Sequence, residues 1–215
     1  MKARYLVIGV LGAVLGTLIG AAVYSGEQGA VTDEFRKQFI KDFKRIGLNT
    51  TPEDAMTLRI LIEASKAKRG VEVGSATGFG AINMGVGFER NGGRLDTIDI
   101  DPKMVAATRE NVRKMGLEKV VTVIEGDALK VLPTIEGDVD FVFIDALKQD
   151  YGKYFKLISP RLKPGAVIVA DNAIQSASAM KDFLDFMRTS PEWEMVIVQT
   201  SKEKNDGMAV CYKVR

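Results

Sequence analysis

From residue 70 to the C-terminus, short apolar runs alternate with stretches in which apolar residues recur every three or four positions. The short runs have the length and composition of buried strands, and the stretches between them have helical periodicity. Seven strands are expected, over residues 71–73, 94–100, 120–124, 139–144, 166–170, 194–199 and 208–214. Helical stretches, notably 102–115 and 176–188, separate the first six runs, but none separates the last two. The pattern predicts an α/β fold: a Rossmann-like, seven-stranded, mostly parallel sheet with helices on both faces and an antiparallel edge strand.

Two helices are predicted before the first strand. Thr32 is suited to cap the first helix, which places Phe35, Phe39 and Phe43 on one face. The second begins at Thr51, which is followed by a proline and two acids, a composition favoured in the first turn.

Residues 5–24 are a separate feature, twenty consecutive residues without a charged side chain, preceded by Lys2 and Arg4. As a helix, this segment would span about 30 Å, the thickness of the hydrocarbon core of a bilayer. We therefore expect an N-terminal hydrophobic helix within residues 1–25, followed by one folded domain over residues 26–215.

Three interpretations of this segment compete. A single-pass membrane anchor is favoured, which predicts a membrane-anchored protein. The second is a cleaved signal peptide, which would export the domain, although the apolar run exceeds the usual length for such a peptide. The third is a buried core helix. The side of the membrane is left open, because Arg36, Lys37 and Lys41 offset the basic residues that precede the segment.

Composition narrows the chemistry more than the fold. The chain has 215 residues, enough for one α/β domain and a short extra segment. Its net charge of +2, with no basic run interleaved with aromatic residues, argues against nucleic acid as a partner. It contains no histidine, which excludes a His-based triad, a His general base and a His-containing zinc site. Asp, Glu, Lys, Tyr or Asn must carry any chemistry, with a hard, oxygen-preferring ion as the expected helper.

A glycine-rich segment follows the first predicted strand. Its glycines Gly74, Gly78 and Gly80 allow the backbone to approach a ligand with no Cβ in the way. Gly74 lies four residues before Gly78, so the segment does not match the Gly-x-Gly-x-x-Gly fingerprint of dinucleotide-binding proteins. The alternative is a tight strand-to-helix turn without a ligand, and the glycines alone do not decide between the two.

Acidic or amide side chains follow the next four predicted strands. Asp99 ends the second strand, where an acid can accept hydrogen bonds from ribose hydroxyls. Asp127 follows the third strand, where the amino group of an adenine would lie. Asp145 follows the fourth strand, and Asp171 and Asn172 follow the fifth. Because ligands of such sheets bind at the carboxyl ends of the strands, these side chains are expected to converge.

Asp145, Asp171 and Asn172 are the candidates for metal binding. They offer only oxygen ligands, which Mg²⁺ prefers in combination with waters or substrate. The alternative is that each caps a helix or forms a turn, which is common after a strand. Their joint occurrence at neighbouring strand ends favours a site for Mg²⁺, or for Mn²⁺ or Ca²⁺.

Taken together, these strand-end motifs resemble those of the metal-dependent O-methyltransferases that include the catechol and caffeoyl-CoA enzymes. The resemblance runs from about residue 51 to the C-terminus. It rests on five motifs in family order: Val71-Glu72-Val73-Gly74, Asp99-Ile100-Asp101, Gly126-Asp127-Ala128, Phe143-Ile144-Asp145-Ala146-Leu147-Lys148 and Val169-Ala170-Asp171-Asn172. The resemblance implies that S-adenosylmethionine (SAM) donates a methyl group to a hydroxyl of a small acceptor.

The resemblance also implies a role for each motif. The residues that would contact SAM are Glu72, Gly74, Ala76, Gly78, Gly80, Asp99, Asp127, Ala128 and Asp145. Asp145, Asp171 and Asn172 would bind the metal ion. Lys148 falls where the family carries its general base. A cation beside a lysine lowers the lysine's pKa by like-charge repulsion, so Lys148 is suited to take a proton near neutral pH.

The acceptor pocket departs from that of the catechol enzymes. Leu147 falls where those enzymes place a tryptophan against the ring, and Ser176 falls where they have a proline wall. Ala209 replaces an acid that orients their substrate. We therefore do not assign catechol itself; an aromatic vicinal diol and a hydrophobic or membrane-borne hydroxyl compound are both compatible with the sequence.

Two other functional classes remain to be tested. One is a Rossmann-type NAD(P)-binding oxidoreductase, which the glycine spacing disfavours and which has no use for the Asp145, Asp171 and Asn172 cluster. The other is a catalytically inactive, membrane-tethered SAM-binding protein, which the retention of Lys148 disfavours. Assembly as a homodimer is left open.

Overall fold

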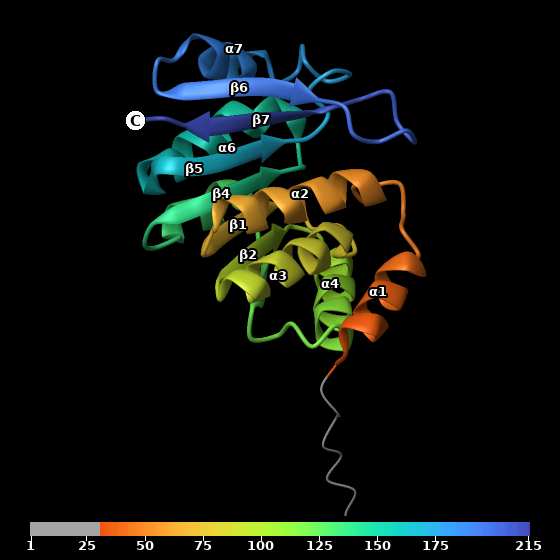
Figure 1. Ribbon diagram of the computed structural model, residues 1–215. Coiled ribbons are helices and arrows are strands. Elements are labelled where there is room, and N and C mark those ends of the chain that lie inside the picture. The colour runs from red at the N-terminus through yellow and green to blue at the C-terminus, as the bar shows by residue number, and fades with distance from the viewer. Residues whose placement is uncertain (1–30) are drawn as a thin grey trace, which may run out of the picture.

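The computed structural model describes residues 31–215, which form one seven-stranded sheet with helices on both faces (Figure 1). The strand order is β3-β2-β1-β4-β5-β7-β6. The strands are β1 (Arg69–Val73), β2 (Arg94–Asp99), β3 (Val121–Glu125), β4 (Val139–Ile144), β5 (Leu162–Ala170), β6 (Trp193–Val198) and β7 (Met208–Lys213). The first five are parallel, and β7 pairs antiparallel with both β5 and β6. The fold predicted from the sequence is confirmed for the sheet and its antiparallel edge.

Helices cover both faces of the sheet. They are α1 (Asp33–Lys41), α2 (Pro52–Ser65), α3 (Phe79–Asn91), α4 (Pro102–Lys114), α5 (Ala128–Val131), α6 (Tyr151–Ile158) and α7 (Lys181–Thr189). One buried cluster joins α2, α3 and α4 to the sheet through Phe141 and Phe143 of β4. A second joins α5, α6 and α7 through Val142 and Ile144 of the same strand. Alternate residues of β4 thus point to opposite layers of the core, as a doubly covered parallel strand requires.

The helix expected over residues 176–188 begins later than predicted. Residues 171–180 form consecutive turns, and α7 starts at Lys181. Within the turns, the carboxylate of Asp206 accepts hydrogen bonds from the backbone N–H groups of Ile174 and Gln175, at 3.0 Å each. The backbone leaving β5 is therefore held by an acid from a distant loop, which local periodicity does not reveal.

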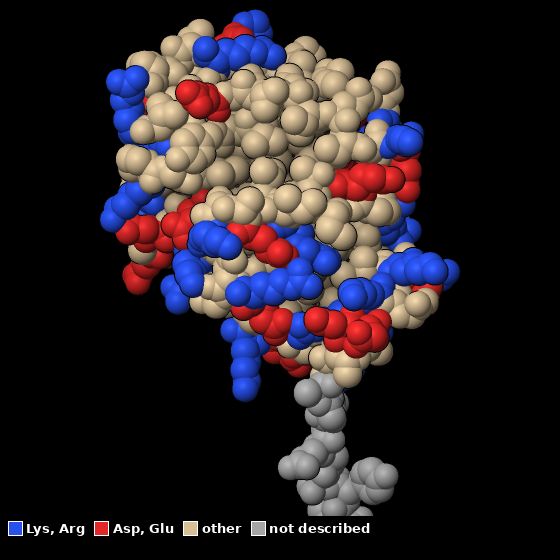
Figure 2. All heavy atoms as spheres, in the orientation of Figure 1, with Lys and Arg blue, Asp and Glu red and all other residues tan. Residues whose placement is uncertain are grey.

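Charges on the face shown in Figure 2 are mixed in sign. Its lower half, formed largely by α1, α3 and α4, carries Lys and Arg interspersed with Asp and Glu, and its upper half is mostly uncharged. The net charge of +2 is therefore not gathered into a basic patch on this face.

The predicted membrane localisation is corrected. Segment 5–24, on which the predicted hydrophobic helix, anchor and signal peptide all rest, lies outside the described residues. Within residues 31–215, no helix combines the length and apolar character needed to cross a bilayer. The longest of them, α2, has 14 residues, whereas a crossing takes about 20. The prediction of a membrane-anchored protein is therefore wrong on the structure described, and we do not carry it further.

Gly74, immediately after β1, sits where the chain leaves almost no room. Its φ of +95° lies in the left-handed region that favours glycine, and a Cβ built there would be 2.1 Å from the carbonyl oxygen of Asp145. The close approach lets β1 and β4 end side by side, with the N–H of Asp145 donating to the carbonyl of Val73 at 2.9 Å.

Glu72 of β1 is a buried acid, 1% exposed, beneath this turn. The hydroxyl of Thr97 on β2 donates to its carboxylate, and Gly80 of α3 packs so closely that a Cβ there would be 2.5 Å from Oε1. Burial raises the pKa of Glu72 to about 8, against the opposing hydrogen bond from Thr97, and Asp145 and Asp99 raise it further.

Replacing Gly74 by alanine is expected to destabilise the fold more than the same change at Gly165. Gly165 shares the φ of +95° but has no atom within 4 Å of a built Cβ, so Gly165→Ala isolates the backbone strain, about 1–3 kcal/mol. Gly74→Ala adds the collision with Asp145. Urea unfolding measures both; equal losses of unfolding free energy would show that the contact with Asp145 carries no cost.

The raised pKa of Glu72 predicts a pH dependence of stability. The folded chain favours the neutral carboxyl, so the stability it contributes is complete below pH 4.5 and is lost as pH rises through about 8. Glu72→Gln, which stays neutral and can still accept from Thr97, should flatten the profile of unfolding free energy between pH 5 and 8. Glu194→Gln, on exposed β6, is the control. A Glu72→Gln profile parallel to that of the unmodified chain would contradict the assignment.

Candidate functional site

The carboxyl ends of four parallel strands bring the predicted polar residues together. Register pairs Val73 of β1 with Ile98 of β2 and with Ile144 of β4, and Ile144 with Ala170 of β5. The residues that follow these positions are Gly74, Asp99, Asp145 and Asp171, which therefore lie along one edge of the sheet.

A cleft in two parts runs along this edge. The β2–β3 hollow, about 340 Å³, is lined by residues that include Asp99, Gly126, Asp127, Ala128 and Tyr154. The β4–β5 hollow, about 590 Å³, is lined by residues that include Ala76, Asp145, Lys148, Asp171, Asn172 and Lys204. Both volumes are in the range of small-molecule sites. The two hollows share the lining residues Gly74, Asp99, Ile100, Ala146 and Leu147, so they adjoin along this edge.

Asp99 is held rigidly between the two hollows. Its Oδ2 accepts hydrogen bonds from the backbone N–H groups of Ser75, at 3.0 Å, and Ala76, at 2.9 Å, and its Oδ1 accepts from that of Asp101 at 3.0 Å. The acid is thus fixed by the glycine turn, at the wall of the β2–β3 hollow. Asp127 lines the same hollow and also caps α5, accepting from the N–H of Leu129 at 2.9 Å, so it stabilises the start of this helix alongside any role toward a ligand.

Three residues of the predicted cofactor set lie behind the wall of the cleft. Gly74 and Ala76 line it, but Glu72, Gly78 and Gly80 are not among the described residues that do. A Cβ at Gly78 would come within 3.0 Å of Thr108 on α4, and Gly80 packs on the carboxylate of Glu72. The geometry shows them shaping the turn and its packing, and direct contact of these three with a ligand stays a prediction.

Asp145 and Lys148 form an ion pair in the β4–β5 hollow. The Lys148 Nζ lies 2.8 Å from Oδ1 of Asp145 and donates to the hydroxyl oxygen of Tyr151 at 3.0 Å. Tyr151 is fully buried, so its hydroxyl is a fixed hydrogen-bond acceptor for Lys148. Lys148 is therefore oriented by two groups rather than extended freely into solvent.

Asp171 is the most buried acid of the hollow, with a side chain 3% exposed. Burial raises its pKa to about 6, the charge of Asp145 raises it further, and the hydrogen bond and charge of Lys204 oppose the rise. A buried carboxylate beside a second carboxylate favours a cation between or beside them.

Asn172 is positioned by Asp206. Its Nδ2 donates to Oδ2 of Asp206 at 2.9 Å, which leaves Oδ1 as the oxygen free to accept or to coordinate. The residue has a φ of +61°, in the left-handed region that asparagine tolerates. Asp206 also accepts from three backbone N–H groups; burial works to raise its pKa, but these hydrogen bonds outweigh it and lower the pKa.

Lys204 and Asp54 are functional-site residues that sequence reasoning missed. The Lys204 Nζ contacts both carboxylate oxygens of Asp171, at 2.7 and 2.8 Å, and lies 3.0 Å from Oδ2 of Asp54 in the first turn of α2. Burial works to lower the pKa of Lys204, but Asp171 and then Asp54 raise it. Its sequence context, a charged turn between two strands, carries no signal of these long-range contacts.

The described residues contain no group of three or more His, Cys, Asp or Glu side chains placed to hold a metal ion. The predicted metal ligands are two carboxylates, of Asp145 and Asp171, and the amide oxygen of Asn172. All three oxygen-bearing side chains line the β4–β5 hollow. The donor set suits a hard divalent cation, and Lys204 now supplies the positive charge at Asp171.

The positions that differ from the catechol enzymes are placed as follows. Leu147 is 52% exposed and lines both hollows. Ser176 lies in the turns after β5, and Ala209 is fully buried in β7, paired with Ala170. The acceptor side of the cleft thus presents an apolar side chain at its mouth.

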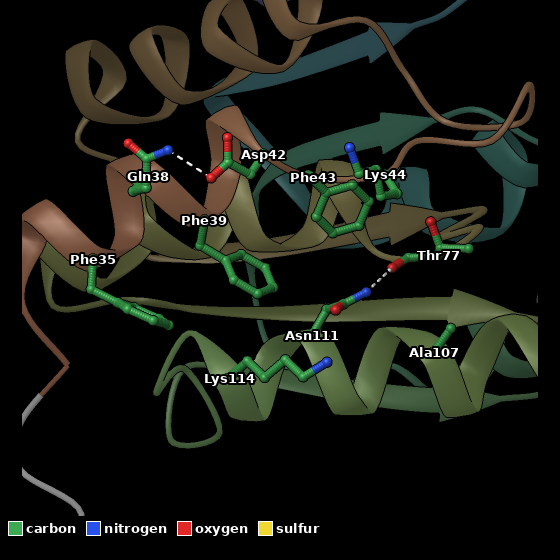
Figure 3. Close-up of a pocket in the computed structure, with 10 residues that line it drawn as sticks. All are labelled: Phe35, Gln38, Phe39, Asp42, Phe43, Lys44, Thr77, Ala107, Asn111 and Lys114. Carbon is green, nitrogen blue, oxygen red and sulfur yellow. Dashed lines mark hydrogen bonds between the residues drawn. The ribbon is translucent and has the colours of Figure 1, made fainter.

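Another hollow, about 540 Å³ and largely apolar, lies between α1 and α4, apart from the two hollows at the sheet edge (Figure 3). Phe35, Phe39 and Phe43 face the α4 residues Asn111 and Lys114 across it. None of the strand-end acids lines it, so the candidate site is the cleft at the sheet edge.

Comparison with known proteins agrees with this geometry. The family model described as O-methyltransferase matches residues 23–203. A catechol O-methyltransferase of Mycobacterium tuberculosis is 33% identical over 166 residues, 71% of this chain and 75% of that protein. A catechol O-methyltransferase of Niastella koreensis is 32% identical over 139 residues, 63% of this chain and 62% of that protein. This chain therefore spans less than two thirds of the second relative's length.

Solved structures share the fold. A cofactor-bound protein from MTB, 28% identical, superposes with a TM-score of 0.73 over 83% of this chain and 87% of that chain. An O-methyltransferase of Bacillus cereus in complex with SAH, 24% identical, has a TM-score of 0.74 over 84% of this chain and 89% of that one, which supports the fold alone. The family predicted from the strand-end motifs is confirmed, and nothing in these comparisons favours an oxidoreductase. The chain belongs to the O-methyltransferase family and has the class I methyltransferase fold.

Proposed function

We propose that this protein is a SAM-dependent, divalent-metal-dependent O-methyltransferase that methylates a hydroxyl of a small acceptor, with residues 26–215 as its catalytic domain. The proposal rests chiefly on two adjoining hollows, one suited to adenosine and one lined by Asp145, Lys148, Asp171 and Asn172.

The β2–β3 hollow is the proposed place of the cofactor's adenosine. Asp99, fixed by backbone N–H groups, would accept hydrogen bonds from the ribose, and Asp127 with Ala128 would border the adenine. Gly74 lines both hollows and Ala76 lines the β4–β5 hollow, so the methionine part would run past them toward Asp145. This course would bring the sulfonium methyl to the side of Lys148.

Asp145, Asp171 and Asn172 are the residues that would hold a divalent ion, and their available ligand atoms, all oxygens, suit Mg²⁺, Mn²⁺ or Ca²⁺. A bound divalent cation lowers the pKa of a hydroxyl that contacts it and orients that hydroxyl. The family relatives named as catechol enzymes make an aromatic vicinal diol the first acceptor class to test. The exposed side chain of Leu147 offers such a ring an apolar surface.

Lys148 is the proposed general base. Its Nζ lies beside Asp145 and the Tyr151 hydroxyl. An ion held at Asp145 would take over the carboxylate that stabilises the ammonium, and the neutral amine would then accept the proton of the acceptor hydroxyl. The resulting oxygen attacks the methyl carbon in line with the carbon–sulfur bond, which breaks as the oxygen–carbon bond forms and leaves the sulfur neutral. The cleft contributes the alignment of the two substrates.

Chelation is expected to abolish the proposed reaction. EDTA should lower methylation of a vicinal-diol panel by about 100-fold or more, since a Lewis acid contributes several kcal/mol, and added Mg²⁺ should restore it. Transfer of label from SAM measures both. Asp171→Ala should cause a comparable loss, and Asp138→Ala, an exposed acid before β4, should not. Activity that survives both EDTA and Asp171→Ala would exclude the metal mechanism.

Loss of Lys148 should impair turnover rather than cofactor binding. Lys148→Ala is expected to lower kcat by about 10²–10⁴-fold, the usual contribution of a general base, with SAM affinity nearly unchanged by calorimetry. The control is Lys163→Ala, which removes an exposed lysine paired with Asp138. If turnover is unchanged in Lys148→Ala, another group takes the proton.

A further inference from the structure

The side chain of Lys204 occupies the acidic end of the β4–β5 hollow. It reaches there from the segment between β6 and β7 and contacts the carboxylate of Asp171 through both oxygens, at 2.7 and 2.8 Å. Its side chain is only 21% exposed. The ammonium therefore lies directly on one of the two carboxylates proposed to bind the metal ion.

Two buried acids contact this ammonium. Each accepts a further hydrogen bond: the hydroxyl of Thr200 donates to Oδ1 of Asp54, and the backbone N–H of Asn172 donates to Oδ1 of Asp171. Asp171 is 2% exposed and Asp54 is 1% exposed. Oδ2 of Asp54 has no hydrogen-bond partner among the described residues, and its close contact is Lys204 at 3.0 Å. A buried carboxylate without a cation or hydrogen bonds is costly, so the metal-free chain needs a positive charge at this place.

The backbone that carries Lys204 is held on both sides of it. Before Lys204, Glu203 forms an ion pair with Arg45 at 2.7 Å. After it, the carboxylate of Asp206 accepts a hydrogen bond from the side-chain amide of Asn172 at 2.9 Å. The lysine side chain, in contrast, is a flexible four-carbon stem with a point charge. It can swing out of the hollow while its backbone stays in place.

We propose that Lys204 is a tethered competitor of the divalent ion: its ammonium and the ion exclude one another at Asp171. Binding of the ion then requires that Lys204 withdraw from Asp171, and Lys204 thereby sets the metal affinity of the site. The proposal rests on the proposed function, because it takes Asp171 as a metal ligand. Lys204 acts on the ion's access and is a positioning residue, with no part in the proton transfer.

The test is Mn²⁺ binding to the full chain without SAM or acceptor, measured by the electron paramagnetic resonance signal of free Mn²⁺. Lys204→Gln keeps much of the side-chain length but removes the charge, and should tighten Mn²⁺ binding by about tenfold or more, since hydrogen bonds between charged groups contribute about 1.5–3 kcal/mol. Lys204→Arg keeps the charge and should bind Mn²⁺ nearly as weakly as the unmodified chain. Lys202→Gln removes an exposed lysine from the same loop and is the matched control.

The outcomes separate this inference from the proposed function. Unchanged or weaker binding by Lys204→Gln, with normal binding by the unmodified chain, overturns the competition alone. Equal tightening by Lys204→Gln and Lys204→Arg also overturns it, because the effect would then come from the loop rather than from the charge. If neither the unmodified chain nor Lys204→Gln binds Mn²⁺, the metal site itself is overturned. Thermal unfolding of each variant confirms that the fold is intact.

Discussion

The proximity of two carboxylates at the edge of the sheet is the constraint on which the site depends. Asp145 and Asp171 follow paired positions of β4 and β5, and the backbone N–H of Asp171 still donates to the carbonyl of Ile144 at 3.0 Å. The sheet thus forces two like charges together, one of them almost fully buried. Repulsion and desolvation both oppose ionisation there, which is why the pKa of Asp171 is raised. Two lysines from different segments offset the repulsion between these carboxylates: Lys148 pairs with Asp145, and Lys204 pairs with Asp171.

The same edge ties the two hollows to each other. The carbonyl of Asp145 touches the place that a Cβ of Gly74 would fill, and the turn after Gly74 holds Asp99 through the N–H groups of Ser75 and Ala76. A displacement of Asp145 would therefore move the wall of the β2–β3 hollow as well. A donor and an acceptor can be aligned only if both hollows keep a fixed relation, and this chain of backbone contacts provides it.

Much of this was predictable because it is encoded locally. Short apolar runs that alternate with helical stretches predicted the sheet and its antiparallel edge, and the acids that follow the runs predicted the convergence of Asp99, Asp145 and Asp171. The late start of α7 and the orientation of Asn172 were not predictable, since both depend on Asp206, more than thirty residues away in the chain. The contacts of Lys204 with Asp171 and Asp54 were not predictable for the same reason, because they join residues far apart in the chain. The membrane prediction used hydropathy alone, and no helix within the described residues supports it.

The acceptor side of the site differs from that of the catechol enzymes in the charged residues that it contains. At Ala209, where the catechol enzymes carry an acid, the structure has a fully buried methyl group paired with Ala170, so β7 offers the acceptor no charged partner there. Positive charge enters instead from Lys204, and the exposed side chain of Leu147 supplies an apolar surface at the mouth. In the proposed reaction, a hydroxyl acceptor would be oriented by the ion that Asp145, Asp171 and Asn172 would hold and by burial of its apolar part against Leu147. Such a site selects on the shape of the apolar part more than on a second polar group.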